Sequence, residues 1–256
     1  MYHSKLDEAK DVLNIGQSVL LTGEKGSGKT TIAMNLAEEL GLEFYSESMT
    51  RQTTLSMLLG YRNVHGDYVA TKLRKAAEFG GLMLLDELDA ADANVVLCLN
   101  PIENGYLSFP DTNIKLHKDF RLMATANPPD QHSQYTGRVK LDAATLDRFD
   151  IIEVERDEDL ERSLVDEDTF QRMKVLRAVL RDHNSSIVVS MRDSMRFQSR
   201  KVLNRTEGYI ERLTDHNQAV LEVYNRMVDE LPKYQDQKDC VTFEDLTNLI
   251  KTQSKE

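Results

Sequence analysis

The sequence is short of the residues and segments that mark secreted and membrane-spanning proteins. Its 256 residues include no tryptophan, five prolines and two cysteines. Cys98 and Cys240 stand far apart, which gives no disulfide framework and indicates a reducing compartment. No run of about eighteen apolar residues occurs, and residues 1–10 lack the apolar core of a signal peptide. These absences predict a cytoplasmic protein without a membrane span.

Positive charge is also scarce relative to negative charge. The chain has 43 Asp and Glu against 32 Lys and Arg, which gives a formal net charge of −11. This balance argues against a broad nucleic-acid-binding face, although a local basic patch can coexist with it. The hydrophobic fraction of 40% and the charged fraction of 29% are typical of a globular protein with one large domain or two modest ones.

What the sequence does have is a glycine-rich segment between a short apolar run, residues 18–22, and a helical pattern, residues 31–40. The segment Gly23–Thr30 fits the P-loop pattern G-x-x-x-x-G-K-[ST] at every fixed position. Glycines let backbone N–H groups approach phosphate oxygens, Lys29 reaches the β- and γ-phosphates, and the Thr30 hydroxyl is a ligand for Mg²⁺. A chance match is the alternative, but the flanking strand and helix argue against it. The predicted nucleotide-binding residues are Gly23, Glu24, Lys25, Gly26, Ser27, Gly28, Lys29, Thr30 and Thr31.

A second apolar run, Leu82–Leu85, ends in the acidic pair Asp86 and Glu87. This pattern is typical of a central parallel strand with a functional carboxyl end. We expect Asp86 to hold Mg²⁺, directly or through water, and Glu87 to polarise the attacking water. Alone, the pattern also fits a solvent-exposed strand end. Its position after the P-loop favours the catalytic interpretation.

Two later elements are expected to project from the core. Turn residues and alternation predict a hairpin over Gly105–Leu116, and the polar stretch Tyr61–Tyr68 predicts a projecting loop. Their aromatic residues are Tyr61, Tyr68, Tyr106 and Phe109. Exposed aromatics suggest a partner-facing surface, and the alternative is that the hairpin aromatics fold back onto the core. A strand over residues 120–126 then leads to Asn127, which either orients a water against a γ-phosphate or only begins a turn before Pro128.

Together these motifs resemble those of AAA+ ATPases. The P-loop, Leu82–Glu87, the hairpin, Ala124–Pro128 and Leu146–Asp150 follow one another as in the MoxR and dynein-related branch, which includes CbbQ-type rubisco activases and CobS-type chelatase subunits. Many NTPases share the P-loop and the acidic strand end. The stretches Ala-Thr-Ala-Asn-Pro and Leu-Asp-Arg-Phe are specific to this neighbourhood. The resemblance covers nearly the whole chain and implies ATP and Mg²⁺ as ligands.

The resemblance also implies roles for polar residues beyond the P-loop and the acidic pair. Asn127 corresponds to sensor 1, and Arg148 to the arginine finger that completes the site of a neighbouring subunit. Arg138 is a second candidate for an interface arginine, with a surface-loop charge as the alternative. Arg192 matches the sensor 2 arginine of the lid. Arg196, one turn later, or a merely solvent-exposed helix start are the alternatives there.

The expected fold is α/β, with two domains. Residues 1–155 are expected to form a three-layer P-loop core with a parallel sheet. Residues 156–256 resemble the small all-helical AAA+ lid domain. Helical spacing there predicts a helix over Phe170–Leu180, one long helix over Glu207–Leu231, and a last helix beginning at Thr242.

The function that the resemblance implies is ATP hydrolysis in a ring-shaped homo-oligomer, expected to be a hexamer, that remodels or activates a partner protein. Two other functions stay open. A nucleic-acid-associated motor or loader is disfavoured by the acidic balance of the chain and by the lack of a basic, aromatic-rich segment. A nucleotide-gated assembly scaffold with little turnover is disfavoured by the presence of Glu87. The identity of the partner cannot be read from the chain.

Overall fold

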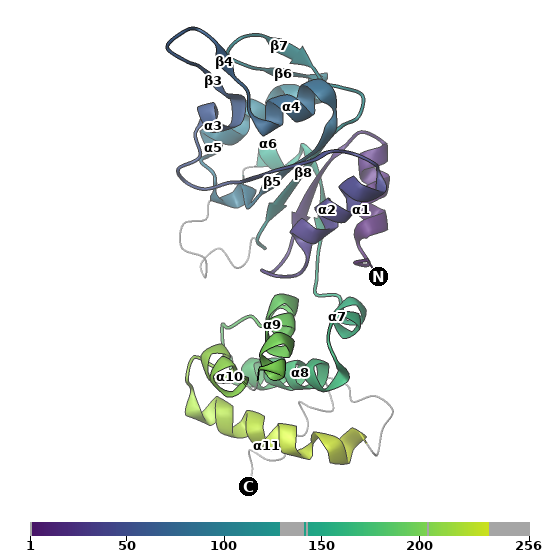
Figure 1. Ribbon diagram of the computed structural model, residues 1–256, viewed down its shortest axis with the longest axis vertical. Coiled ribbons are helices and arrows are strands. Elements are labelled where there is room, and N and C mark those ends of the chain that lie inside the picture. Colours follow the sequence, from purple (N-terminus) through teal and green to yellow (C-terminus); the bar gives the residue numbers. More distant parts are fainter. Residues whose placement is uncertain (1, 129–140, 142, 204, 236–256) are drawn as a thin grey trace. The chain divides into compact units, whose positions relative to one another are not determined.

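A parallel sheet organises the first part of the chain (Figure 1). The computed structural model describes residues 2–128, 141, 143–203 and 205–235. Within these residues, five strands lie in the order β2-β5-β8-β1-β9, and every pairing in this sheet is parallel. The strands are β1 (Ser18–Thr22), β2 (Phe44–Ser48), β5 (Gly81–Asp86), β8 (Phe120–Ala126) and β9 (Phe149–Glu153). The parallel α/β architecture expected from the sequence is confirmed.

Two apolar cores lie on opposite faces of this sheet, because side chains alternate along each strand. Val19 and Leu21 of β1 belong to the core shared with α1 and α2, whereas Leu20 belongs to the core shared with α3, α4 and α5. The helical elements of this unit are α1 (Leu6–Asn14), α2 (Lys29–Glu39), α3 (Leu55–Leu59), α4 (Lys72–Phe79), η1 (Leu88–Ala90), α5 (Ala93–Val96), η2 (Leu97–Asn104) and α6 (Ala143–Leu146). The result is a helix–sheet–helix arrangement of three layers.

The order of the strands decides where the predicted site residues meet. Strands β5, β8 and β1 are direct neighbours, and all three run in the same direction. The segments that follow them therefore leave the sheet at one edge. This edge carries the P-loop after β1, Asp86 and Glu87 at the end of β5, and Asn127 after β8.

Two small antiparallel hairpins belong to the same unit. They are β3 (Tyr61–Arg62) with β4 (Tyr68–Val69), and β6 (Tyr106–Ser108) with β7 (Asn113–Lys115). The second hairpin confirms the prediction for residues 105–116. The first shows that the loop predicted over residues 61–68 is itself a hairpin. Its turn is closed by the side chain of Asn63, whose Oδ1 accepts hydrogen bonds from the backbone N of His65 and of Asp67, both at 2.9 Å.

A single arginine joins the two hairpins to α4. The guanidinium carbon of Arg74 lies 4.9 Å from the ring centroid of Tyr68 and 4.9 Å from that of Phe109. Arg74 also donates to Asp111 (Nη1 to Oδ1, 2.7 Å) and to Glu78 (Nε to Oε2, 2.9 Å). Phe109 is only 7% exposed and belongs to the apolar core. The expectation that Phe109 is an exposed, partner-facing aromatic is therefore wrong, because its ring packs inward against the core and Arg74.

The chain divides after Glu155, and the described part of the second unit is helical. Its helices are α7 (Glu158–Leu164), α8 (Glu167–Asp182), α9 (Met191–Val202), α10 (Glu207–Leu213) and α11 (Gln218–Gln235). Buried residues of α8, α9, α10 and α11 form one apolar core. Among the residues that the structure describes, no helix combines the length and the apolar character needed to cross a bilayer.

The long helix expected over residues 207–231 is wrong, since α10 ends and α11 begins within it. Asp215 and His216 have left-handed backbone angles, with φ of 53° and 55°. The backbone N of His216 donates to the carbonyl of Glu211 at 2.8 Å, which closes the end of α10. Asn217 then begins α11, because its Oδ1 accepts from the backbone N of Ala219 at 3.1 Å. The sequence Asp-His-Asn carries this break, since these residues tolerate left-handed angles and cap helices.

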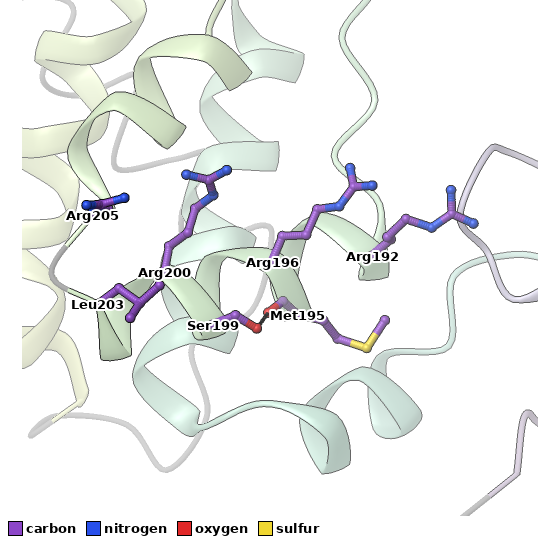
Figure 2. A pocket seen from close by; sticks show the side chains of 7 residues that line it. All are labelled: Arg192, Met195, Arg196, Ser199, Arg200, Leu203 and Arg205. Atoms are coloured by element: carbon purple, nitrogen blue, oxygen red, sulfur yellow. Dashed lines mark hydrogen bonds between the residues drawn. The ribbon is translucent and has the colours of Figure 1, made fainter.

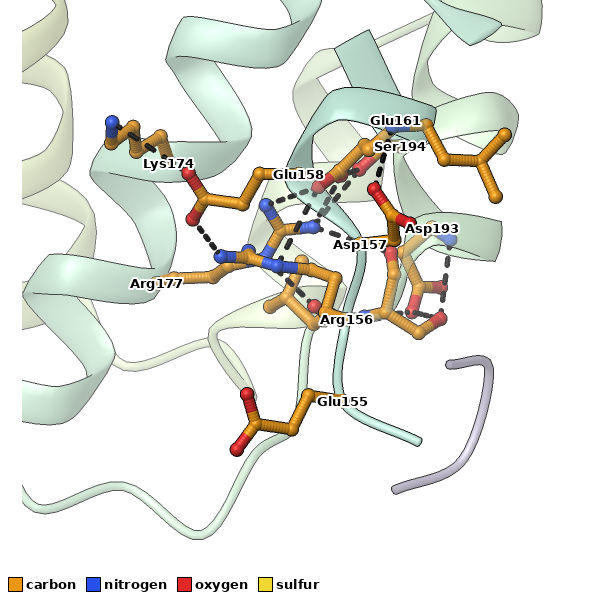
Figure 3. A network of polar contacts seen from close by, with 12 residues as sticks. Glu155, Arg156, Asp157, Glu158, Glu161, Lys174, Arg177, Asp193 and Ser194 are labelled. Atoms are coloured by element: carbon orange, nitrogen blue, oxygen red, sulfur yellow. Dashed lines mark hydrogen bonds and ion pairs between the residues drawn. The ribbon is translucent and has the colours of Figure 1, made fainter. Parts of the chain in front are cut away.

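A buried polar network fixes α7 against α8 and α9 (Figure 3). Glu161 of α7 is 1% exposed and accepts two hydrogen bonds from Arg177 of α8, at 2.6 and 3.2 Å. The hydroxyl of Ser194 on α9 also donates to Glu161. Arg177 in turn donates to the carbonyl oxygen of Val189 at 2.8 Å. Each buried charge in this network therefore has polar partners, as burial of charge requires.

Candidate active site

The P-loop is held against the carboxyl edge of the sheet in a conformation that only glycine permits. A Cβ atom on Gly23 would lie 2.2 Å from the carbonyl oxygen of Val154, so any side chain there would clash with backbone. The backbone N of Gly23 donates to the carbonyl of Ala126 at 3.3 Å. Gly28 has φ of 102° and forms the N-cap of α2, which begins at Lys29. The loop therefore delivers an open helix N-terminus to this edge, where backbone N–H groups favour an anion.

Lys29 lies within this loop, and among the described residues no carboxylate forms an ion pair with it. Its Nζ donates to the carbonyl oxygens of Gly23 at 2.6 Å and Glu24 at 2.8 Å. Burial lowers the pKa of Lys29 to about 8, although the carboxylates of Asp86 and Glu87 favour its charged form. A half-buried ammonium in this setting gains stability from an incoming anion such as a phosphate group.

Ser27 supplies a second sign of a missing partner. The residue is only 3% exposed, and its Oγ has no hydrogen-bond partner within the described residues. Buried hydroxyls in native proteins are normally hydrogen-bonded, so an orphaned one in a glycine loop fits a bound group with acceptor oxygens. The observations on Gly23, Ser27 and Lys29 all fit a nucleotide phosphate chain.

A hydroxyl–carboxylate cluster adjoins the loop. Thr30 Oγ1 lies 3.3 Å and 3.4 Å from the two carboxylate oxygens of Asp86. Thr125 Oγ1 donates to Asp86 Oδ1 at 2.5 Å, which orients the carboxylate. The structure contains no cluster of three His, Cys, Asp or Glu side chains suited to a metal, among the residues that it describes. A Mg²⁺ held by Thr30 and Asp86 would therefore need further oxygen ligands from the nucleotide and water, which is the usual arrangement for this ion.

Glu87 occupies an unusual backbone conformation at the end of β5. Its φ and ψ are 60° and 46°, in the left-handed region that costs a non-glycine residue about 1–2 kcal/mol. The conformation is held by a hydrogen bond from the Glu87 backbone N to Thr125 Oγ1 at 2.8 Å. The Glu87 side chain is exposed next to Asp86. Strain of this kind is often retained at functional positions.

Asn127 is buried at the same edge, after β8. Its Nδ2 donates to Asp89 Oδ2 at 3.1 Å, and Asp89 is fully buried. The bond fixes the orientation of the Asn127 amide, which is what a residue that positions a water or a phosphate oxygen requires. The burial of Asn127 and its bond to Asp89 fit the predicted role in orienting a water, which stays a prediction.

Two residues of this cluster were missed by the sequence analysis. Thr125 joins β8 to the acidic end of β5, and Asp89 orients Asn127. The signal for Asp89 was the repeat of an acidic residue three positions after Asp86, within Asp-Glu-Leu-Asp. For Thr125, the signal was a lone hydroxyl residue within the apolar run of β8.

Not every predicted site residue joins this cluster. Arg148 precedes β9, and the register pairs Phe149 with Ser18 and Glu153 with Thr22. Arg148 therefore lies at the amino edge of the sheet, about 13 Å of strand away from the edge that carries the P-loop. Its Nε lies 3.3 Å from Glu103 Oε1.

The other two predicted arginines lie outside the described residues of the first unit. Arg192 lies in the first turn of α9 in the second unit and is exposed. Arg138 lies outside the described residues.

Comparison with known proteins agrees with this geometry. A family model described as "AAA domain (dynein-related subfamily)" matches residues 18–149. An uncharacterized protein of Staphylococcus epidermidis is 26% identical over 165 residues, which cover 58% of this chain and 59% of that protein. Midasin of Giardia intestinalis is 32% identical over 149 residues, which cover 54% of this chain and 3% of midasin.

Among solved structures, NtrX from Brucella abortus in complex with ADP is similar with a TM-score of 0.56. The sequence identity is 17%, and the match covers 79% of this chain and 49% of that one. This likeness concerns the fold alone. The chain spans less than two thirds of the length of each of these three proteins.

Proposed function

Because the chain belongs to the dynein-related subfamily of AAA domains, a family of ATPases, we propose that it binds and hydrolyses ATP as a ring and remodels or activates a partner protein. The resemblance inferred from the sequence is thereby confirmed at the level of this subfamily. The observation that carries the proposal is the meeting of Lys29, Asp86 and Glu87 at one sheet edge, next to an orphaned P-loop hydroxyl.

In this proposal the P-loop residues act on the phosphate chain. Lys29 exchanges its two backbone carbonyl acceptors for phosphate oxygens, and Ser27 Oγ gains the partner that it lacks. Thr30 and Asp86 would hold Mg²⁺, which supplies neutralisation of phosphate charge. The proposed ligands are thus ATP and Mg²⁺.

Glu87 is the proposed general base. Its carboxylate accepts a proton from the attacking water, while Asn127, fixed by Asp89, orients that water against the γ-phosphate. The left-handed backbone of Glu87 supports this role, since it aims the side chain differently from a regular continuation of β5.

Arg148 is the proposed arginine finger, and its position favours action on another subunit. A finger that served its own chain would have to lie near the P-loop, but Arg148 lies at the opposite edge of the sheet. Its guanidinium would stabilise charge on the γ-phosphate bound by a neighbouring subunit in the ring, expected to be a hexamer. Arg192 is proposed to reach the phosphates from the second unit, which would act as the lid.

The partner-directed part of the proposal draws on the hairpins. Tyr61 is 52% exposed and Tyr106 is 37% exposed, and both lie on hairpin strands. Tyr61 and Tyr106 are therefore the proposed partner-contacting aromatic residues, whereas the buried Phe109 is not. A nucleic-acid-directed motor is the second candidate, and stimulation of ATP turnover by DNA would favour it. The cytoplasmic location stays a prediction.

The test separates nucleotide binding from turnover. Lys29→Ala should abolish tight ATP binding, because Lys29 contacts the ground-state phosphates. Glu87→Gln should keep binding and lower kcat roughly 10²–10⁴-fold, because only the base is lost. Binding is measured with a fluorescent ATP analogue and turnover by phosphate release.

The matched control is Glu38→Gln, which removes an exposed carboxylate from α2 outside the site. It should change neither binding nor turnover. If Glu87→Gln kept most of its turnover, the assignment of the base would be wrong. If the wild-type protein bound ATP without hydrolysing it, the scaffold function would replace the ATPase.

A further inference from the structure

A row of arginines runs along α9 in the helical unit (Figure 2). Arg192, Arg196 and Arg200 stand at every fourth position of the helix, and Figure 2 shows their side chains on the same side of it, with Arg205 beyond the helix end. These residues line a surface groove with a volume of about 460 Å³. Four guanidinium groups thus gather on a chain whose net charge is −11.

The charges in this groove are largely unneutralised. Within the described residues Arg205 has no carboxylate partner, and Arg196 lies 3.8 Å from Asp193 Oδ1. Arg192, at the start of the row, is the arginine proposed to reach the nucleotide, so Arg196, Arg200 and Arg205 remain for another partner. Asp193 is already engaged, because it accepts from the hydroxyl of Tyr209 at 2.8 Å and completes the capping box of α9. Neighbouring positive charges repel one another, so an anionic partner would stabilise this surface.

Apolar side chains adjoin the arginines. Met195 is 41% exposed and Leu203 is 65% exposed, and both line the groove. Met195 on α9 and Leu203, the residue after the end of α9, each follow an arginine by three positions and therefore lie beside the arginine row. A partner for this surface must therefore offer both carboxylates and apolar side chains.

The same residues disfavour a nucleic acid as that partner. Single-stranded nucleic acids bind to proteins by stacking bases on exposed aromatic rings. None of the described residues that line the groove is aromatic. The nearby ring of Tyr209, which has the guanidinium carbons of Arg200 and Arg212 at 4.9 and 4.8 Å from its centroid, is 1% exposed. No base can reach it.

We propose that the α9 groove binds an acidic amphipathic helix of a partner protein. Residues four apart on a helix are separated by about 6 Å along its axis, so carboxylates at every fourth position of the partner match the arginine row in register. Apolar residues on the adjoining row of that helix pack against Met195 and Leu203. The inference rests on the proposed partner-directed function for the source of the helix, but not on ATP hydrolysis.

The test uses the full chain and a fluorescein-labelled, alanine-based helical peptide of about 20 residues. The peptide carries glutamates at every fourth position and leucines on the adjoining row. A scrambled peptide of the same composition and a single-stranded DNA of similar charge serve as competitors, and binding is read by fluorescence anisotropy. We expect the patterned peptide to bind roughly tenfold more tightly than the scrambled one, with an affinity that falls as salt rises.

Variants then locate the site. Arg205→Glu should weaken binding of the patterned peptide roughly tenfold, because it places like charges in contact. Arg226→Glu makes the same charge change on α11, outside the groove, and should leave binding within about twofold. Circular dichroism checks that both variants fold.

Three results would overturn the inference. They are equal binding of the scrambled peptide, no effect of Arg205→Glu, or tighter binding of DNA that Arg205→Glu abolishes. Peptide binding is measured without ATP turnover, so the two proposals are tested separately. A protein without ATPase activity could still bind the peptide at the groove, and a protein that did not bind the peptide could still hydrolyse ATP.

Discussion

The polar groups at the P-loop and those of the Glu161–Arg177 network in the helical unit differ in how completely they are hydrogen-bonded. In the first unit, Lys29 rests on backbone carbonyls, Ser27 Oγ has no partner within the described residues, and Glu87 is strained. In the helical unit, Glu161 and Arg177 bond to each other and to further groups. The Ser27 hydroxyl thus lacks a partner at the P-loop, whereas Glu161 and Arg177 are bonded throughout their network. Elsewhere in the helical unit, Gln171 Oε1 and Tyr224 Oη also lack hydrogen-bond partners among the described residues. In the proposed function the P-loop groups gain their partners from the nucleotide, whereas the network serves helix packing.

The largest effect is expected where the P-loop site depends on an arginine from another copy of the chain. Arg148→Ala should bind ATP almost normally and lose roughly 10³–10⁵-fold in turnover, because in its proposed role as arginine finger the guanidinium acts on the transition state. Mixing Arg148→Ala with Lys29→Ala should recover part of the activity, since hybrid interfaces pair an intact P-loop with an intact Arg148. The measurement is phosphate release from defined mixtures.

The matched control for that mixture is a single-variant preparation of each protein at the same total concentration. Native mass spectrometry establishes that mixed rings form. If mixed rings formed without any recovery, action of Arg148 on a neighbouring subunit would be contradicted.

A second test concerns the helical unit, where the Glu161–Arg177 network should contribute to the free energy of unfolding. Glu161→Ala leaves Arg177 buried without its carboxylate and should destabilise this unit by about 3–5 kcal/mol. Hydrogen exchange followed by mass spectrometry should show faster exchange in α7, α8 and α9 than in β1, β5 and β8. Glu158→Ala removes a carboxylate that is 47% exposed from the same helix and should cost less than about 1 kcal/mol. Equal effects of the two variants would mean that burial of the network contributes nothing.

A third test uses pH to measure the cost of desolvating the charge of Lys29 in the nucleotide-free protein. Burial lowers the pKa of Lys29 from its ordinary 10.5 to about 8, so between these values the unfolded chain binds more protons than the folded one. The free energy of unfolding should therefore rise with pH in this window, by up to about 1.4 kcal/mol per pH unit, for the wild-type protein relative to Lys29→Met. Below pH 8 the difference between the two proteins should be constant. A difference that fell with pH would show that Lys29 is not penalised by burial.

The smallest effect concerns the strain at Glu87. Glu87→Gly should raise the free energy of unfolding by about 0.5–1 kcal/mol, because glycine accepts left-handed angles at less cost. Glu87→Gln keeps the strain and should leave thermal stability unchanged, although both variants lose turnover. Thermal unfolding of the three proteins measures this. A less stable Glu87→Gly would indicate that the side chain stabilises the turn and that no strain is stored there.

Much of this arrangement could be predicted because its signals are contiguous in the sequence. The P-loop, Asp86 and Glu87 are short motifs at strand ends, and parallel strands bring such ends to one edge. Thr125 and Asp89 were missed because their roles depend on contacts across the sheet, which no local pattern encodes.

Long-range packing also explains the errors. The burial of Phe109 involves its contact with Arg74, which is 35 positions earlier in the chain. A contact between residues so far apart produces no periodic pattern in the sequence. The break before α11 was encoded locally by Asp-His-Asn, but apolar periodicity on both sides concealed it. The second unit's helices were nevertheless predictable as a class, because helical spacing is a local property.

Because Arg74 contacts both hairpins, neither hairpin can be exchanged by protein engineering without affecting the other. Its guanidinium contacts Tyr68 of one hairpin and Phe109 and Asp111 of the other. The two hairpins and Arg74 therefore have to be transferred to another protein as one unit. A chimera that exchanged residues 61–69 alone would remove the contact of Arg74 with Tyr68 and keep its contact with Phe109. Grafting a new recognition surface onto this scaffold therefore means moving residues 61–69, Arg74 and residues 106–115 together.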